Sequence, residues 1–138
     1  MPTDTPASTS RPRPRLATAY PQLHVTDIAR SVDFYVQTLG FREVYRYGKP
    51  PFYALVERDG AGLNLRHVDA PLLDQSFVES ESLIVASIPT YGIDQLYAEI
   101  QAHGAPLAQP MTKQPWGAKD FIVRDPDGNL ICFGEATA

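Results

Sequence analysis

The segment QPWGAKDFIVRDPDGNLICFGE, residues 114–135, holds two strand-like runs separated by a tight turn. The runs AKDFIVRD and LICFGE are rich in the β-branched and aromatic residues that strands favour, and PDGN between them is a turn signal. The segment also holds the only tryptophan of the chain, Trp116, between Pro115 and Gly117. The pattern therefore predicts a hairpin that closes the chain, with the indole on the loop that leads into it.

The same order of elements is predicted twice. Each half reads as a strand, a helix and then further strands, from the alternation of apolar residues and the Gly and Asp residues that end or cap helices. In the first half these runs are 17–25, 27–40, 41–47, 52–58 and 62–68. In the second half they are 82–89, 92–104 and the closing hairpin, with an ambiguous run near Leu107 and a loop expected over 69–81.

The two halves align as an internal repeat. The hairpin turns Asp59-Gly60 and Asp127-Gly128 are separated by 68 residues. That offset matches three pairs of apolar positions, which are Leu55 with Val123, Leu63 with Ile131, and Leu65 with Phe133. One helix on a small open sheet buries too little surface to be stable alone, but two copies can share a core. The sequence predicts an α+β fold of two βαβββ modules that form a cupped mixed sheet.

This repeat forms one domain over residues 17–136, with modules at about 17–68 and 82–136. Residues 1–16 are rich in Pro, Ser and Thr and have no apolar period, so we expect a disordered tail. The net charge is −4 although three arginines lie in the tail, which argues against a nucleic-acid partner. No apolar run is long enough for a membrane span or a signal peptide. The single cysteine, Cys132, favours the reducing cytoplasm.

Several motifs together resemble a known superfamily. The segment DIARSVDFYVQTLGF (27–41) after the first strand and RDPDGN (124–129) in the last hairpin resemble the vicinal-oxygen-chelate superfamily of glyoxalases, extradiol dioxygenases and bleomycin-resistance proteins. Within it, AYP (19–21), GIDQLYAEI (92–100) and QPWG (114–117) are most similar to the bleomycin-resistance proteins. The resemblance implies a homodimer that exchanges N-terminal strands, with Pro21 at the exchange, and two crevices that bind the drug unchanged.

The enzymes of this superfamily hold a divalent metal with His, Glu or Gln ligands. The resemblance places the corresponding positions of this chain at Tyr20, Asn64, Val85 and Cys132. These residues do not make a site for a hard cation, which takes carboxylate or imidazole ligands. We therefore expect no metal, no other cofactor and no catalytic residue. A metal-dependent glyoxalase- or dioxygenase-like enzyme with atypical ligands remains the alternative.

The resemblance also implies a stacking site. Trp116 corresponds to an indole that stacks on the planar bithiazole of the drug, and alignment from LGF (39–41) places the opposing aromatic ring at Phe52. An aromatic pair suits a planar and partly cationic ligand. Other residues expected in the ligand site are Tyr45, Tyr47, His24, Arg66 and Gly117, with Tyr53 nearby. Arg66 and Arg46 would add positive charge, which disfavours a cationic ligand.

Overall fold

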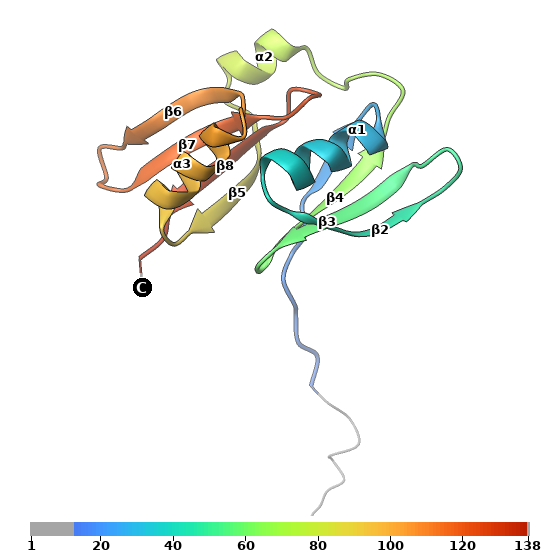
Figure 1. The fold of residues 1–138 in the computed structure, drawn as a ribbon, viewed down its shortest axis with the longest axis horizontal. Helices are drawn as coiled ribbons and strands as arrows, with labels where there is room; N and C mark the ends of the chain where they lie inside the picture. Colours follow the sequence, from blue (N-terminus) through green and yellow to red (C-terminus); the bar gives the residue numbers. More distant parts are fainter. Residues whose placement is uncertain (1–12, 138) are drawn as a thin grey trace, which may run out of the picture.

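The computed structural model describes residues 13–137 and contains two four-stranded mixed sheets (Figure 1). The first sheet has the strand order β1-β4-β3-β2 and the second the order β5-β8-β7-β6. In each sheet the first and last strands of the module pair in parallel and the remaining neighbours are antiparallel. The predicted strand–helix–three-strand order is thus confirmed in both halves. The strands are β1 Gln22–Val25, β2 Arg42–Tyr47, β3 Tyr53–Arg58, β4 Ala61–His67, β5 Ile84–Thr90, β6 Leu107–Lys113, β7 Lys119–Arg124 and β8 Leu130–Glu135.

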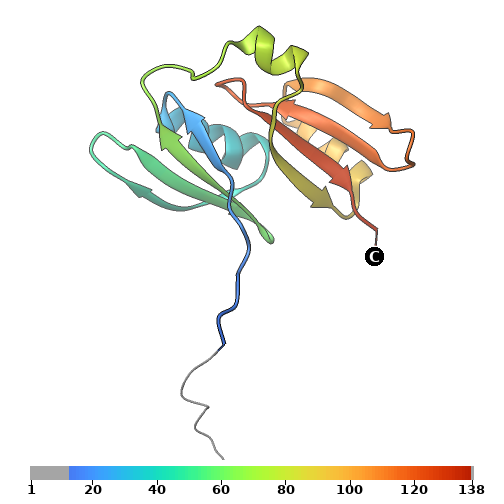
Figure 2. The same ribbon diagram turned by 180° about the vertical axis from the view of Figure 1, so that it is seen from behind.

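The helices of the two modules lie on one side of the molecule. α1 (Ile28–Asp33) and α3 (Ile93–Ala102) are in front in Figure 1, whereas Figure 2 shows the opposite sheet faces from behind. We call these uncovered faces of the two sheets the open faces. Because side chains alternate along a strand, every second residue points to the open face and the others into the core.

The first helix begins as predicted and changes its winding midway. The Asp27 side chain accepts a hydrogen bond from the Arg30 amide at 3.0 Å, as expected of an N-cap. After α1 the chain continues as a π-helix, η2 (Phe34–Thr38), and Gly40 stops it with a φ of +75°. The wider turn places Tyr35 on the fully buried side of the helix.

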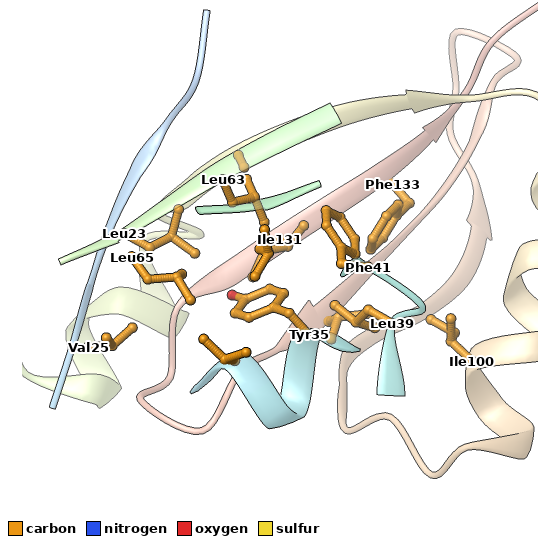
Figure 3. Close-up of a cluster of buried hydrophobic side chains, with 14 of the residues drawn as sticks. Leu23, Val25, Tyr35, Leu39, Phe41, Leu63, Leu65, Ile100, Ile131 and Phe133 are labelled. Carbon is orange, nitrogen blue, oxygen red and sulfur yellow. The ribbon is translucent and has the colours of Figure 1, made fainter. Parts of the chain in front are cut away.

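One hydrophobic core serves both modules. Its members include Leu23 and Leu65 from the first sheet, Ile131 and Phe133 from the second, and Ile100 of α3 (Figure 3). This arrangement agrees with the argument that neither module could bury a sufficient core alone.

A buried polar contact crosses this core. The Tyr35 hydroxyl donates to Asp125 Oδ2 at 2.9 Å, while the backbone N–H groups of Asp127 and Asn129 donate to the same carboxylate. Burial raises the pKa of Tyr35 well above its ordinary value, so its hydroxyl keeps its proton and donates. Burial also raises the pKa of Asp125, although its hydrogen bonds act in the opposite direction. The contact fixes the helix of the first module to the closing hairpin of the second.

The segment between the modules was predicted as a loop, and this was wrong for part of it. Residues 75–80 form a short helix, α2 (Gln75–Ser80), capped by Asp74. No residue of α2 is buried, so it lacks the apolar period that would have indicated a helix. Arg124 on β7 holds it through two hydrogen bonds to Glu79, at 2.7 and 3.0 Å.

Two further expectations need correction. The strand predicted over 17–25 begins only at Gln22, and described residues 13–21 form no regular element. The predicted match of Leu55 with Val123 is wrong by one residue, because the structural counterpart of Val123 is Val56. Both valines lie in the core, whereas Leu55 pairs with Asn64 and points to the open face. The shift arises because the second hairpin has a longer turn than the first. The other two matched pairs all lie in the core.

Most of the predicted tail, residues 1–12, lies outside the described residues, and described residues 13–16 are exposed. The ambiguous run near Leu107 is strand β6, whose register against β7 is interrupted by irregularities. None of the helices in the described part of the chain is long and apolar enough to cross a membrane.

Candidate ligand-binding site

Trp116 lies on the loop that joins β6 to β7, and its side chain is 74% exposed. The loop is closed by two backbone hydrogen bonds of 2.9 Å, from Gln114 N to Ala118 O and from Gly117 N to Gln114 O. Gly117 has a φ of +102°, a conformation that only glycine adopts easily. The loop therefore presents a large apolar side chain to solvent from a defined backbone.

Phe52 immediately precedes β3 and is 51% exposed. Its N–H donates to Tyr47 O at 2.9 Å and its carbonyl accepts from His67 N at 2.8 Å. Its ring lies over Gly48, where an added Cβ would clash with Phe52 Cδ1. The absence of a side chain at Gly48 thus allows the Phe52 ring to rest on its own turn while one side stays exposed.

Trp116 and Phe52 belong to connections at opposite ends of the molecule. In Figures 1 and 2 the β6–β7 connection lies at one outer end of the molecule and the β2–β3 connection at the other. Within one chain these two rings are not walls of one slot.

A row of tyrosines covers the open face of the first sheet beside Phe52. The rings of Tyr45 and Tyr53 stack at 6.2 Å between centroids, and those of Tyr45 and Tyr47 lie 5.1 Å apart. The Tyr53 hydroxyl donates to Gln22 Oε1 at 3.4 Å. Burial raises the pKa of Tyr45, and the charges of neighbouring tyrosine side chains raise it further to a smaller extent. Its hydroxyl therefore stays protonated at neutral pH. The row is an aromatic surface with hydroxyl donors.

Tyr20 extends this surface across the sheet. Its hydroxyl donates to Glu57 Oε2 at 3.1 Å, and this hydrogen bond raises its pKa. Its ring lies on Gly62, where an added Cβ would be 2.7 Å from Tyr20 Cε1. The next residue, Pro21, accepts a hydrogen bond from Asn64 N at 2.9 Å. In the described chain the segment before β1 therefore packs on its own sheet.

His24 and Arg66 are register partners on the open face, since their strand neighbours Leu23 and Leu65 are buried. Arg66 Nη1 donates to His67 O at 2.6 Å, so the guanidinium folds back along its own strand. His24 lines a small pocket of about 120 Å³. Residues 71–73, between the two modules, and Val85 of β5 also line this pocket. The structure gathers Tyr45, Tyr47, His24 and Arg66 on one face, whereas Trp116 and Gly117 lie at the far end of the other sheet.

The chain matches known proteins over most of its length. The family model of the glyoxalase/bleomycin resistance protein/dioxygenase superfamily matches residues 17–133. The chain belongs to this superfamily. A bleomycin resistance protein of Geobacillus stearothermophilus is 34% identical over 127 residues, covering 82% of this chain and 92% of that protein. A bleomycin resistance protein of Staphylococcus aureus matches to the same extent.

A solved structure shares the superfamily fold. The bleomycin-binding protein of bleomycin-producing Streptomyces verticillus, complexed with copper(II)-bleomycin, has a TM-score of 0.70 and 23% identity, and the match covers 91% of this chain and all of that one. The predicted family and fold are thus confirmed.

Three of the four positions that the resemblance assigns to metal ligands carry unsuitable donors in this chain, and the fourth, Asn64, supplies a single buried amide oxygen. Val85 has no donor atom, and the Tyr20 hydroxyl is bound to Glu57. Burial raises the pKa of the Cys132 thiol, which disfavours the thiolate that binds metals. Among residues 13–137 no group of three or more His, Cys, Asp or Glu side chains is placed to hold a metal ion. These residues do not fit the divalent metal of the enzymes.

A cavity of about 1030 Å³ between the two modules was not predicted from the sequence. Its lining includes Leu39 and Phe41 of the first module, Leu96 and Phe133 of the second, and Tyr20. Neither Trp116 nor Phe52 lines it. No sequence motif signals this cavity, because its lining residues meet only when the two halves of the chain pack against each other.

Proposed function

We propose that this chain is a binding protein that sequesters bleomycin, or a similar planar aromatic antibiotic, and thereby confers resistance without changing the drug. The observation that carries the proposal is Trp116, which is 74% exposed in a closed loop of a chain 34% identical to bleomycin resistance proteins. An indole held in solvent offers a flat surface for stacking on a planar ring.

The proposal requires two chains. Trp116 and Phe52 lie at opposite ends of one molecule, so a slot with both rings as walls forms only between copies. We propose a homodimer with two such slots, each with Trp116 of one chain and Phe52 of the other. Closed twofold symmetry is the most common arrangement of homo-oligomers and gives two equivalent sites.

The surroundings of the site are compatible with a cationic ligand. Arg46, which was expected to disfavour a cation, is paired with Glu43 through hydrogen bonds of 2.7 and 3.2 Å. Arg66 donates to a backbone carbonyl oxygen of its own strand, which leaves its positive charge in place. The tyrosine row leaves aromatic faces that attract cations. We propose the cytoplasm as the compartment, since the one cysteine is free.

Titration with bleomycin tests the proposal, because Trp116 is the only indole and its fluorescence reports on the site directly. We expect saturable quenching, and a weakening of binding by about 2–4 kcal/mol in Trp116→Ala when measured by calorimetry. Tyr91→Ala is the matched control, since Tyr91 is 71% exposed on the β5–α3 turn. Bacteria that express the wild-type chain should survive bleomycin better than those that express Trp116→Ala. Equal affinity and equal survival for the two chains would exclude this function for the loop.

A further inference from the structure

The loop that carries Trp116 is tied to β7 by a carboxylate. Asp120 Oδ1 accepts a hydrogen bond from Gln109 Nε2 at 2.7 Å and another from Gln114 Nε2 at 2.9 Å. Gln109 Nε2 also lies 3.3 Å from the Asp120 carbonyl oxygen. Gln114 is the first residue of the loop, so Asp120 connects β6, the loop and β7 at one oxygen atom.

The Asp120 side chain lies on the open face of the second sheet. The core residues Phe121 and Val123 are fully buried on the helix side, and alternation places Asp120 opposite to them. The Cys132 thiol lies near Asp120, since the Asp120 charge raises the pKa of that thiol, although burial is the larger cause. The register partner of Asp120 is Gly134, and an added Cβ there would have nothing within 4 Å. There is therefore open space beside the carboxylate.

Both side chains that donate to Asp120 are neutral amides. Lys119, its neighbour in sequence, is bound to Asp94 at 2.7 Å, and Arg124 farther along β7 is bound to Glu79. In the described part of the chain Asp120 makes no ion pair. Its negative charge is consequently not neutralised by the protein, although it lies beside free space four residues from the exposed indole.

We propose that Asp120 is the positioning residue of the Trp116 loop and the carboxylate that selects a positively charged ligand. This inference rests on the proposed binding function and makes it more specific. Gln114 transmits the positioning, because it joins the loop to Asp120. A carboxylate near a stacking indole attracts a cation attached to a planar ring, and the aromatic face adds to that attraction. The ligand class is then a planar aromatic molecule with a cationic group next to the rings.

Three variants of the full-length chain separate the two roles. Asp120→Asn keeps an oxygen that can accept from both amides but removes the charge. Gln114→Ala removes the link to the loop but keeps the charge. Asp120→Ala removes both, and its circular dichroism and thermal melting show whether the fold is intact.

The first measurement is the fluorescence anisotropy of Trp116 without ligand. We expect Asp120→Ala and Gln114→Ala to lower the anisotropy, whereas Asp120→Asn should retain the wild-type value. Unchanged anisotropy in both Asp120→Ala and Gln114→Ala would overturn the positioning role.

The second measurement is the ratio of affinities for two bleomycins, one with its cationic terminal group and one whose terminal group is neutral. The wild type and Gln114→Ala should prefer the cationic drug. In Asp120→Asn the ratio of the two affinities should fall about fivefold, as expected for a partly exposed charge pair. An unchanged preference in Asp120→Asn would overturn the selecting role. If wild-type protein binds neither drug, the selecting role fails together with the proposed function, while the anisotropy still decides the positioning role.

Discussion

Arg58 and Glu99 join the two modules through a bidentate ion pair. Arg58 Nη1 and Nη2, at the end of β3, donate to the two carboxylate oxygens of Glu99 on α3 at 2.7 and 3.1 Å. Arg58 Nη1 also donates to Leu39 O at 2.9 Å, at the end of the first helical segment. One side chain thereby connects a strand and a helix end of one module to the helix of the other.

We expect this pair to make the fold sensitive to acid. The hydrogen bond from Arg58 holds the pKa of Glu99 below its ordinary value. A carboxylate with a lowered pKa contributes stability above its unfolded pKa, about 4.3 for glutamate, and loses it as the pH falls through the lower folded value. Both side chains are about one third exposed, so the contribution should be only about 0.5–1 kcal/mol. Urea unfolding of the wild type and Glu99→Gln at pH 7 and pH 3 should differ at pH 7 and converge at pH 3.

Tyr35→Phe should destabilise the protein by about 1–3 kcal/mol, because a buried carboxylate loses a donor while the ring volume is unchanged. The hydroxyl of Tyr35 donates to Asp125 at the junction of the modules. Denaturant unfolding measures the change, and Tyr91→Phe on the surface is the matched control. Equal loss in both variants would mean that the buried hydrogen bond is not the cause.

Purified protein should contain no stoichiometric iron, manganese, nickel or zinc. The reason is the chemistry of Tyr20, Val85 and Cys132 at the positions where the superfamily enzymes place ligands. Elemental analysis after expression in metal-supplemented medium tests this. A content near one metal per chain that disappears in His24→Ala would support the metal-dependent enzyme instead.

The repeat, the order of strands and most helix ends were predictable because they depend on local patterns. Asp27 caps a helix and Gly40 ends one through contacts within a few residues of each. Helix α2 was missed because distant residues hold it, Arg124 of β7 through Glu79 and Gly128 of the β7–β8 turn through Gln75, rather than an apolar face of its own. The contacts of Asp120 were equally hidden, since its two partners are brought to it only when β6 pairs with β7.

Trp116→Ala should leave the fold almost unchanged. The side chain is mostly in solvent, so its removal creates no core cavity, and large losses of stability come from such cavities. The free energy of unfolding, measured by thermal melting, should agree between the variant and the wild type within about 0.5 kcal/mol, the usual range for surface substitutions. Phe121→Ala, in the core of the same sheet, is the contrasting control and should cost about 3–5 kcal/mol. A collapse of the fold in Trp116→Ala would show that the indole is structural.

A slot shared between two chains can be tested by complementation. Trp116→Ala and Phe52→Ala each remove one wall, so neither homodimer should have a complete slot. If the walls come from different chains, the mixed dimer has one slot with both rings and one slot with neither. Unfolding and refolding an equal mixture should pair about half of the chains into mixed dimers and restore roughly one tight bleomycin site per four chains. Calorimetry would count these sites, and sedimentation of the mixture would confirm the dimer. A monomer at micromolar concentration, or a mixture that binds no better than its two components, would show that Trp116 and Phe52 do not form one slot across two chains.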